Sequence, residues 1–573
     1  MTCPIKVFKK KIEEFFFSKC FTCKYAHERI HDMSTDLFEK WLDDNGLARK
    51  QHQVDGVEFC VENETLHGRG GLIADEMGLG KTYVMLGTMV QNPLPKTLIV
   101  LPLALLEQWD KIVKKYLNDL NTFVYHSSNT HDYKSALPME HDTIHFQDLN
   151  PKKKGSKAHA LYESYKKAHT FGEAKLMGMR ICDFHNDKKH GYLHMETDTV
   201  ITAVKKLDKA QVVITTYGKT MSSGVKLLYK YQWDRIIFDE AHHLRNMKTT
   251  RFTGSNKLSG KIRWLITGTP IQNRLADFYS LCQQMGMKKE YYTDLRNLNS
   301  IVKNYIIKRT KKNAGIQLPP INIVPVETTW DNSNEENLSE QIHSLLPFTN
   351  VRKDISNSVS HLSGNGYMLP CLIRARQVCI YPKLLKRVVE KHVENGALET
   401  DPDFMDAVEC NSKIDLVVKT IVERKNNTRN KIVFCHYRNE IDIISDKLIH
   451  HGIRVCTFDG RTSHSQRGVV LGKPCDVLIL QIQTGCEGLN LQQFKEIYFV
   501  SPHWNPAVED QAIARCHRIG QDDCVDVFRF TMKNFGSTTA NIENYINDVQ
   551  LSKREIADDF SDKCEKATIA PSQ

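Results

Sequence analysis

The residues with the clearest chemical potential lie in one short loop, residues 74–82 (ADEMGLGKT). Its two glycines, Gly78 and Gly80, let the backbone approach phosphate oxygens closely, and the N–H groups around them can cradle an anion. Lys81 would reach the β- and γ-phosphates, and the Thr82 hydroxyl suits Mg²⁺. The loop therefore predicts a nucleoside triphosphate site. The simpler interpretation is a glycine-rich turn with an incidental lysine.

A second pair of candidate catalytic residues, Asp239 and Glu240, opens the sequence DEAH directly after the apolar run RIIF. Ligands of open α/β sheets bind at the carboxyl ends of the strands. We therefore expect Asp239 to hold Mg²⁺ together with Thr82, and Glu240 to polarise the water that attacks the γ-phosphate. A DE pair by itself is common on surface loops, so its position after a strand supports this prediction more than its composition does.

Two series of short apolar runs would position these motifs. Near-continuous apolar strands of this length, separated by helices, are typical of parallel sheets covered on both faces. The first series lies at 97–103, 211–217, 235–242 and 263–269, and the second at 431–437, 476–483, 496–502 and 525–532. The predicted fold class is α/β, with two lobes of parallel sheet covered by helices.

The domain organisation follows from the two series. We predict an N-terminal extension at 1–48, an ATP-binding lobe at 49–310, a linker with a helical extension at 311–411, and a C-terminal lobe at 412–573. Pro-rich and Asn/Glu-rich stretches at 317–322 and 331–337 favour exposed connections, so the hinge is expected there. Residues 127–209 depart from the strand–helix rhythm and are rich in lysine. This segment is predicted to be a basic insertion in the first lobe.

The composition limits the class of protein. The chain has 573 residues, of which 41% are hydrophobic and 25% charged, and its formal net charge is +10. The 16 cysteines show no framework, which indicates reduced thiols inside the cell. No run reaches the roughly 18 apolar residues that a membrane span needs, and the first residues lack the apolar core of a secretion signal. The positive excess suits a polyanion, although it also promotes solubility.

Six motifs occur in order along the chain: DEMGLGKT, DEAHHLRN and TGTPIQN, then GCEGLNL, HWNPAVEDQA and RCHRIGQ. In this order they closely resemble the motifs of the Swi/Snf-type ATPases of helicase superfamily two, over about residues 51–533. The resemblance implies two RecA-like lobes joined by a hinge, with ATP and Mg²⁺ as cofactors clamped between them. It also implies movement along double-stranded DNA without full strand separation. The chain has the motor motifs and almost no accessory module, and in this it resembles the compact members encoded by large DNA viruses, the baculovirus global transactivators.

The resemblance implies roles for individual residues. Gln53 would read the adenine edge, residues 97–109 and 212–217 would contact DNA, and Thr267, Thr269 and Gln272 would couple hydrolysis to lobe movement. The cofactor-binding residues implied in this way are Gln53, Asp75, Glu76, Met77, Gly78, Leu79, Gly80, Lys81, Thr82, Thr267, Gln272, Gly488 and Gln511.

The second lobe is expected to supply the charge that compensates the γ-phosphate. Arg515 and Arg518 lie three residues apart and so share a helix face. Guanidinium groups delivered across a cleft act as arginine fingers, with Arg518 as the first candidate. The predicted catalytic residues are therefore Lys81, Asp239, Glu240, Arg515 and Arg518. Glu487 departs from the family pattern, because its negative charge would weaken the approach of DNA phosphate or ATP ribose unless a basic neighbour pairs with it.

The primary functional prediction is a DNA-dependent ATPase that translocates on double-stranded DNA and remodels DNA–protein complexes in the nucleus. Activation of transcription, with the transcription machinery or chromatin as partners, is the finer expectation. Two alternatives stay open. One is a strand-separating helicase acting on DNA or RNA. The other is a DNA-binding coactivator with a weak or vestigial ATPase, and Glu487 is the reason to keep it.

Three further segments have both a functional and a simpler interpretation. The basic insertion is either an arm that grips a duplex or a solvated loop, and residues 151–157 (PKKKGSK) within it are either an import signal or part of that loop. Residues 20–31 offer zinc donors, but only three residues separate the two pairs, which is short for a tetrahedral site. Residues 182–194 are a weaker candidate of the same kind. The donors of the first segment are Cys20, Cys23, His27 and His31.

Overall fold

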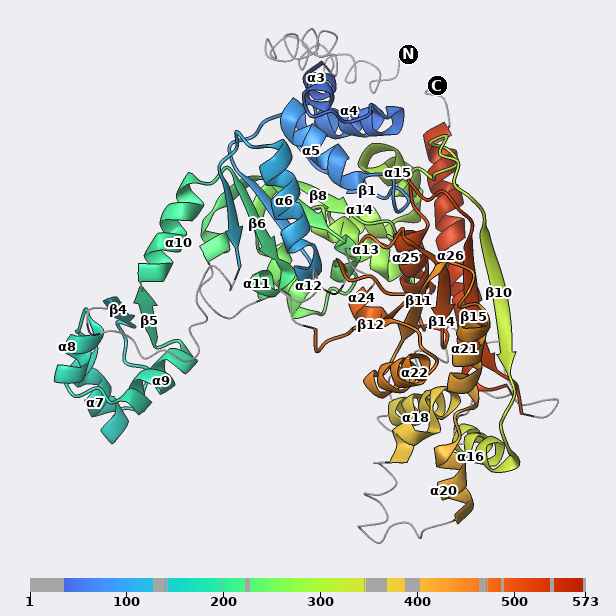
Figure 1. The fold of residues 1–573 in the computed structure, drawn as a ribbon. Helices are drawn as coiled ribbons and strands as arrows, with labels where there is room; N and C mark the ends of the chain where they lie inside the picture. Colours follow the sequence, from blue (N-terminus) through green and yellow to red (C-terminus); the bar gives the residue numbers. More distant parts are fainter. Residues whose placement is uncertain are drawn as a thin grey trace, which may run out of the picture.

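The fold consists of two parallel α/β lobes and a small module attached to the first of them (Figure 1). It is a computed structural model, which describes residues 36–126, 140, 143–196, 198–221, 227–344, 346, 368–386, 402–462, 470, 472–485, 489–535 and 540–569. The predicted fold class is confirmed. The zinc candidate at 20–31, Glu487 and Gly488 lie outside the described residues.

Lobe one is built on a seven-stranded sheet in the order β3-β6-β2-β7-β8-β1-β9, and all of its strand pairs are parallel. The four predicted runs form β2, β6, β7 and β8, while β1, β3 and β9 are short strands that the apolar pattern did not single out. The strands are β1 (Leu72–Ile73), β2 (Thr97–Leu101), β3 (Thr122–Tyr125), β6 (Val212–Thr216), β7 (Gln232–Asp239), β8 (Ser259–Ile266) and β9 (Ile306–Ile307).

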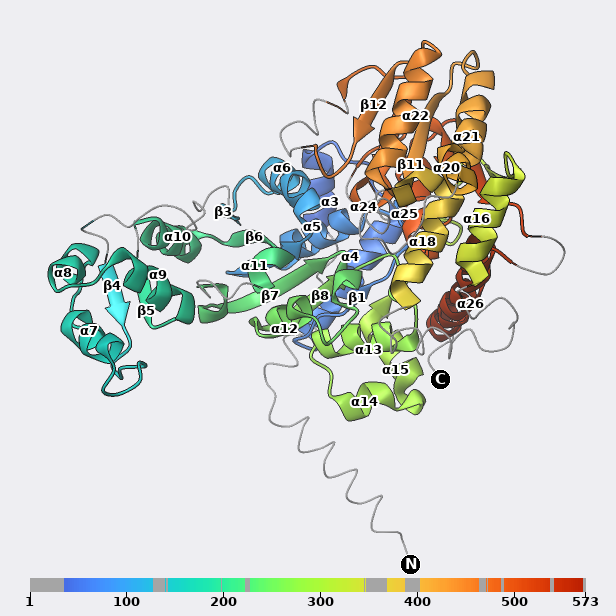
Figure 2. The ribbon, with the colours of Figure 1, turned by 90° about the horizontal axis from the view of Figure 1, so that it is seen from below.

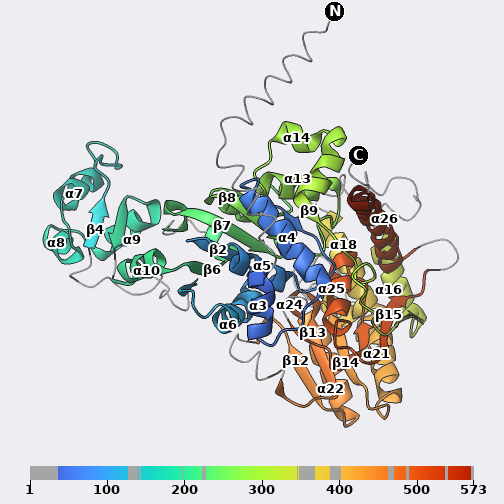
Figure 3. The same ribbon diagram turned by 90° about the horizontal axis from the view of Figure 1, so that it is seen from above.

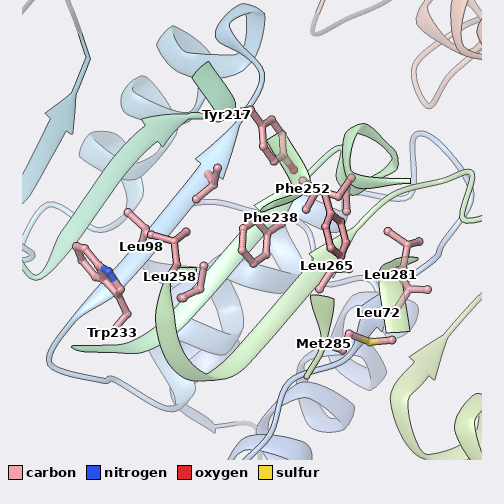
Figure 4. Packing of buried hydrophobic residues seen from close by; sticks show 14 of the residues in the cluster. Leu72, Leu98, Tyr217, Trp233, Phe238, Phe252, Leu258, Leu265, Leu281 and Met285 are labelled. Carbon is pink, nitrogen blue, oxygen red and sulfur yellow. The ribbon is translucent and has the colours of Figure 1, made fainter. Parts of the chain in front are cut away.

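The near-continuous apolar strands of this sheet contribute side chains to two hydrophobic cores, one on each face. Along β2, Leu98 and Val100 face one core and Ile99 and Leu101 face the other, because successive side chains point to opposite faces. The core shown in Figure 4 joins the strands to helices that follow β3 in the chain. Those helices are α10 (Asp198–Lys209), α11 (Tyr217–Met221), α12 (Thr250–Asn256), α13 (Leu275–Gln284), α14 (Lys289–Thr293) and α15 (Leu298–Tyr305). The other face is covered by α3 (Asp36–Asp44), α4 (Gln51–Thr65), α5 (Lys81–Gln91) and α6 (Leu106–Tyr116).

The predicted insertion is folded over its described residues. An antiparallel pair, β4 (Thr143–Phe146) and β5 (Leu193–Glu196), packs with α7 (Lys157–Tyr165), α8 (Phe171–Leu176) and α9 (Ile181–His190) around a small core of its own. The module projects from lobe one on the side away from the second lobe (Figures 1 and 2). The solvated-loop interpretation is therefore wrong for this module, because Tyr162, Tyr165 and Phe184 are buried in it. Residues 151–156 form an irregular segment before α7, and their role as an import signal stays a prediction.

Lobe two is built on a six-stranded parallel sheet in the order β10-β15-β14-β11-β13-β12. Its strands are β10 (Ile321–Thr328), β11 (Asn430–Cys435), β12 (Val455–Phe458), β13 (Val477–Gln481), β14 (Phe494–Phe499) and β15 (Val525–Met532). Its helices are α16 (Ser333–Ser344), α18 (Met368–Ile380), α20 (Pro402–Glu409), α21 (Ser412–Glu423), α22 (Arg438–His450), α24 (Ile482–Gly485), α25 (Pro506–Cys516) and α26 (Ile542–Ile569). The four predicted runs of this lobe form β11, β13, β14 and β15.

The predicted linker contains a strand of the second sheet. β10 pairs with β15 over eight residues, from Ile321 opposite Val525 to Thr328 opposite Met532. Pro325 is tolerated because β10 is an edge strand, where one side of the backbone needs no partner. The second sheet thus begins at Ile321, about ninety residues before the boundary that the sequence suggested at 412.

The last helix, α26, packs against both lobes. It contacts α18 and α25 of lobe two and α15 of lobe one, and Figure 3 shows it beside the junction. Lys413 of α21 and Glu543 of α26 form a buried ion pair, with Nζ 2.5 Å from Oε2. Among the described residues, no helix is long and apolar enough to cross a membrane.

Candidate nucleotide site

The loop at 74–82 forms a compact turn between β1 and α5. Gly78 and Gly80 have φ angles of 91° and 84°, in the left-handed region that favours glycine. Lys81 begins α5, and its Nζ lies 2.8 Å from the Asp75 carbonyl oxygen and 3.3 Å from that of Glu76. Burial lowers the pKa of Lys81, although Glu240, Asp75 and Asp239 oppose this shift. The ammonium group is thus held over the loop, where a phosphate would lie.

Gln53 touches the loop from α4. Its Nε2 donates to the Leu79 carbonyl oxygen over 3.2 Å, and His52 Nε2 lies 2.9 Å from the same oxygen. A Cβ atom on Gly80 would stand 2.3 Å from Gln53 Nε2. A side chain at Gly80 would therefore displace the Gln53 amide, and the φ of 84° also favours glycine there. That Gln53 also reads the adenine edge stays a prediction.

The Asp75 side chain ties the loop to the residues after β9. Its carboxylate is 1% exposed and accepts hydrogen bonds from the Arg309 backbone N–H and Nε, each over 3.0 Å. Glu76 accepts a bond from the Lys311 backbone N–H over 2.7 Å and pairs with Lys311 Nζ at 3.1 Å. Arg309 occupies the Asp75 carboxylate, and contact of Asp75 with the nucleotide stays a prediction. The sequence analysis missed Arg309 and Lys311, which follow β9.

Asp239 ends β7 at the carboxyl edge of the sheet, as predicted. Trp109 Nε1 donates to its Oδ2 over 2.7 Å, and the Glu240 N–H donates to its Oδ1 over 2.8 Å. The Tyr217 hydroxyl donates to its main-chain oxygen over 2.8 Å. Burial, with the charge of Glu240, raises the pKa of Asp239 to about 6. A buried carboxylate with a raised pKa gains from a nearby cation.

Glu240 meets groups from both lobes. Its backbone has φ 48° and ψ 50°, a strained conformation for a non-glycine residue. Its Oε2 lies 3.3 Å from His242 Nδ1, and its Oε1 lies 3.5 Å from Arg515 Nη2 of lobe two. Burial opposes ionisation, but His242, Arg515 and Lys81 together hold the pKa of Glu240 at about 2. Glu240 is therefore a carboxylate at neutral pH.

The segment 267–273 (TGTPIQN) links the loop, the DEAH box and lobe two. His242 Nδ1 lies 3.3 Å from Thr267 Oγ1, and Gln272 Nε2 donates to Thr269 Oγ1 over 3.0 Å. Gln272 Oε1 accepts a bond from Arg245, and from Asn505 Nδ2 of lobe two over 3.0 Å. Of the three residues predicted to couple the lobes, Gln272 contacts both lobes, while Thr267 and Thr269 contact residues of lobe one.

Three more of the predicted residues, Met77, Leu79 and Thr82, belong to the loop itself. A Cβ atom on Gly268 would lie 2.9 Å from Met77 Cγ, which brings Met77 against the 267–273 segment. Leu79 is buried, and Thr82 is the second residue of α5.

Lobe two contributes the end of α25 and the turn after it. Arg518 lies next to the loop, since a Cβ atom on Gly78 would stand 3.7 Å from Arg518 Cβ. Burial and the neighbouring charge of Arg515 lower the pKa of Arg518. Gln511 is buried on α25. The structure therefore brings both predicted arginine fingers to the lobe-one site, with Arg515 in direct contact with Glu240.

The donor set suits a hard cation. Asp239 offers a buried carboxylate and Thr82 a hydroxyl, and oxygen ligands of this kind are those that Mg²⁺ prefers. The zinc candidate at 182–194 lacks such support. Among the described side chains, the one group of three metal-ligating donors is Asp331, Glu335 and Cys410 in lobe two, which contains no residue of 182–194.

Comparison with protein families finds two matches along the chain. Residues 52–384 match the SNF2-related domain, and residues 412–520 match the helicase conserved C-terminal domain. The chain belongs to the SNF2-related family. The predicted family, and an enzyme class of SNF2-type ATPase that binds ATP, are thereby confirmed.

Relatives of this SNF2-related ATPase come from viruses, bacteria and plants. It is 25% identical to the probable global transactivator of Orgyia pseudotsugata multicapsid polyhedrosis virus, over 88% of this chain and 89% of that protein. It is 25% identical to the uncharacterized ATP-dependent helicase MG018 of Mycoplasma genitalium, over 91% of this chain and 43% of that protein. For the Arabidopsis thaliana protein CHROMATIN REMODELING 5, identity is 24%, over 90% of this chain and 27% of that protein.

Among solved structures, the SNF2-related chain matches the Sulfolobus solfataricus SWI2/SNF2 ATPase core in complex with dsDNA. Identity is 19%, and the match covers 91% of this chain and 95% of that one, with a TM-score of 0.33. A superposition of this quality does not relate the two proteins residue by residue.

Proposed function

We propose that this SNF2-related ATPase is a translocase on double-stranded DNA that uses ATP to remodel DNA–protein complexes in the nucleus. The observation that supports this best is the division of the nucleotide site between the lobes, with Arg515 of lobe two 3.5 Å from Glu240 of lobe one. A guanidinium that must cross between lobes makes hydrolysis depend on their closure. Each ATP is then linked to a movement of one lobe against the other.

The residues of the site have separate roles in this proposal. Lys81 and the N–H groups around Gly80 bind the phosphates. Asp239 and Thr82 would hold Mg²⁺, which when bound screens the negative charge of the phosphate oxygens. Glu240 is a carboxylate at neutral pH, so it would orient the attacking water by accepting its hydrogen bond.

Arg515 would leave Glu240 for the γ-phosphate. Glu240 and the γ-phosphate are both anions that would compete for the Arg515 guanidinium, and a phosphate with several negative charges attracts a guanidinium more strongly than a single carboxylate does. Arg518, which lies beside Gly78, would add a second positive charge from the same lobe. Closure of the lobes therefore completes the site.

Double-stranded DNA is proposed as the substrate on three grounds. The chain is a member of the SNF2-related family, its net charge is +10, and its relatives include proteins named chromodomain-helicase-DNA-binding protein 9 and CHROMATIN REMODELING 5. A nuclear location follows from the same relatives. The name of the viral relative, probable global transactivator, supports a role in activating transcription, with the transcription machinery or chromatin as partners.

The proposal is tested by steady-state ATP hydrolysis with no nucleic acid, duplex DNA, single-stranded DNA or RNA. We expect the duplex to stimulate hydrolysis most, and Lys81→Ala to lower the rate by about 10²-fold or more. Lys419→Ala, an exposed lysine on α21, is the matched control and should keep the wild-type rate. Stimulation by RNA or single strands above that by duplex DNA would refute the proposal.

Three further assays separate the alternatives. Displacement of a labelled strand from a tailed duplex would identify a strand-separating helicase, whereas displacement of a third strand or a bound protein without strand separation supports the translocase. Duplex binding with no stimulated hydrolysis would identify a coactivator with a vestigial ATPase. A reporter gene activated equally by wild type and Lys81→Ala would show that activation does not need the motor.

A further inference from the structure

Two segments that the sequence assigned to DNA contact converge on one residue of the nucleotide site. Trp109, on α6 after β2, donates its indole N–H to Asp239 Oδ2 over 2.7 Å. Tyr217, which begins α11 after β6, donates its hydroxyl to the Asp239 main-chain oxygen over 2.8 Å. Trp109 is 1% exposed and Tyr217 is 3% exposed, so both side chains point into the lobe.

We propose that these two hydrogen bonds couple duplex binding to ATP hydrolysis by setting the position of Asp239. Trp109 and Tyr217 are then positioning residues that act through Asp239. The inference rests on the proposed function, because it assigns the route by which a duplex on lobe one would reach the nucleotide site.

The geometry of α6 suits such a route. Leu106, Trp109 and Val113 are buried on one face of this helix. Lys111 and Lys114 are exposed on another face, where they pair with Glu107 at 2.6 Å and with Asp110 at 2.8 Å. Exposed lysines neutralise phosphates without reading sequence. The helix has three turns and moves as a rigid unit, so a duplex that shifts its outer face also shifts the indole on its inner face. A change at the surface is thereby delivered to the Asp239 carboxylate.

Tyr217 has a comparable connection. Its ring lies 5.6 Å from that of His243 and 5.8 Å from the Arg251 guanidinium, and Arg251 Nη1 lies 2.7 Å from His243 Nδ1. His243 follows the DEAH box directly in the sequence. The residue that begins α11 therefore contacts the segment after Asp239 as well as Asp239 itself.

Packing alone does not require these bonds. A phenylalanine ring would fill most of the space of either side chain, whereas the bonds orient Asp239 at both its carboxylate and its carbonyl. Trp233 and Tyr229 of the same lobe offer a contrast, since they donate to the main-chain oxygens of Leu228 and Thr220. Those acceptors lie outside the nucleotide site.

The test uses Trp109→Phe and Tyr217→Phe, with Trp233→Phe and Tyr229→Phe as matched controls that remove the same groups elsewhere in lobe one. For each full-length variant we would measure ATP hydrolysis with and without duplex DNA, and duplex affinity by fluorescence anisotropy. We expect the ratio of stimulated to basal rate to fall by about 5-fold or more in the two test variants, which is the lower end of typical coupling. Duplex affinity and the controls should be unchanged.

A second measurement follows Asp239 without hydrolysis. Mn²⁺ binding in the presence of ADP, measured by electron paramagnetic resonance, should weaken by about 10-fold in Trp109→Phe, because the indole orients the carboxylate that would hold the ion. An unchanged stimulation ratio in both test variants would overturn the inference, and so would an unchanged Mn²⁺ affinity in Trp109→Phe. If Trp109→Phe does not fold, the stimulation ratio of Tyr217→Phe decides alone.

The failure of the inference can be told from that of the proposed function. A wild-type enzyme that duplex DNA does not stimulate overturns both, since no coupling then exists. A stimulated wild type whose test variants are stimulated to the same degree overturns the inference and leaves the translocase in place.

Discussion

The ion pair between Asp75 and Arg309 gives the most informative prediction, because two interpretations of Asp75 differ in what they expect. If Asp75 contacts the nucleotide, its loss should weaken ATP binding and leave the fold intact. The structure instead places the Asp75 carboxylate, 1% exposed, on the Nε and backbone N–H of Arg309. The pair joins the entrance of the phosphate loop to the residues after β9.

The expected magnitude follows from burial. Arg309→Met leaves the buried carboxylate with one backbone N–H where it had a guanidinium as well. Removing one partner of a buried pair costs about 3–5 kcal/mol. With a urea dependence of about 3 kcal/mol per molar, the unfolding midpoint of lobe one should fall by about 1 M or more.

The assay is urea unfolding followed by circular dichroism, for Asp75→Asn, Arg309→Met and the double variant. We expect the double variant to lose at least about 1 kcal/mol less than the sum of the single variants, because each single change already breaks the same pair. Arg296→Met, which removes an exposed pair with Asp294, is the control and should leave the midpoint unchanged. The reasoning would be refuted if Asp75→Asn weakened ATP binding and left the unfolding midpoint unchanged, with effects of Asp75→Asn and Arg309→Met on stability that simply add.

Three further predictions concern separate parts of the molecule. Gly80→Ala should abolish ATP binding, since its Cβ would stand 2.3 Å from Gln53 Nε2, whereas Gly155→Ala has a similar φ and open space around it and should keep binding. Lys413→Met should lower the free energy of unfolding of lobe two by about 3–5 kcal/mol, because it leaves a carboxylate buried and unpaired. Burial raises the pKa of Glu440 to about 7, so the protonated form stabilises lobe two and this contribution is lost as pH rises from 4.5 through 7. Glu440→Gln should therefore gain about 3 kcal/mol relative to wild type over that range, measured by urea unfolding at several pH values.

Each of these predictions has an outcome that contradicts it. Equal ATP affinities for Gly80→Ala and Gly155→Ala would show that the approach of Gln53 does not matter. A double variant, Lys413→Met with Glu543→Gln, should recover part of the lost stability, and failure to do so would argue that the pair is not the cause. Parallel pH profiles of wild type and Glu440→Gln would show that this carboxyl does not titrate in the range.

Much of the lobe architecture was predictable because parallel strands buried on both faces need long apolar runs. Each of the eight runs found in the sequence forms a strand of the predicted lobe. The strands that escaped notice are short, as β1 and β9 are, or are edge strands with a mixed pattern, as β10 is. In β10, Pro325 and the alternating polar residues are equally typical of an edge strand and of an exposed connection. Only the pairing with β15 shows that the segment is a strand.

The insertion shows a different limit. Its lysines fitted both an arm that grips a duplex and a solvated loop, because the composition shows the net charge of the segment but not its packing. Its core depends on a few aromatic residues far apart in the sequence, such as Tyr162, Phe171 and Phe184, which pack only when β4 and β5 bring the ends of the segment together. Composition cannot show that closure.

By itself the sequence determined the chemistry of this protein: a lysine and two glycines in a loop, a carboxylate pair after a strand, and two arginines three residues apart. These are local patterns, set by neighbours in the chain, so they survive without the fold. The structure places only Arg515 on α25, because that helix ends at Cys516, so the predicted shared helix face is wrong. Only the tertiary structure decided which groups meet. In the fold, Asp75 pairs with Arg309, and both Trp109 and Tyr217 donate hydrogen bonds to Asp239. Arg515 lies beside Glu240, although 275 positions separate the two in the sequence. Such pairings depend on how two sheets and their helices pack, and no spacing along the chain records them.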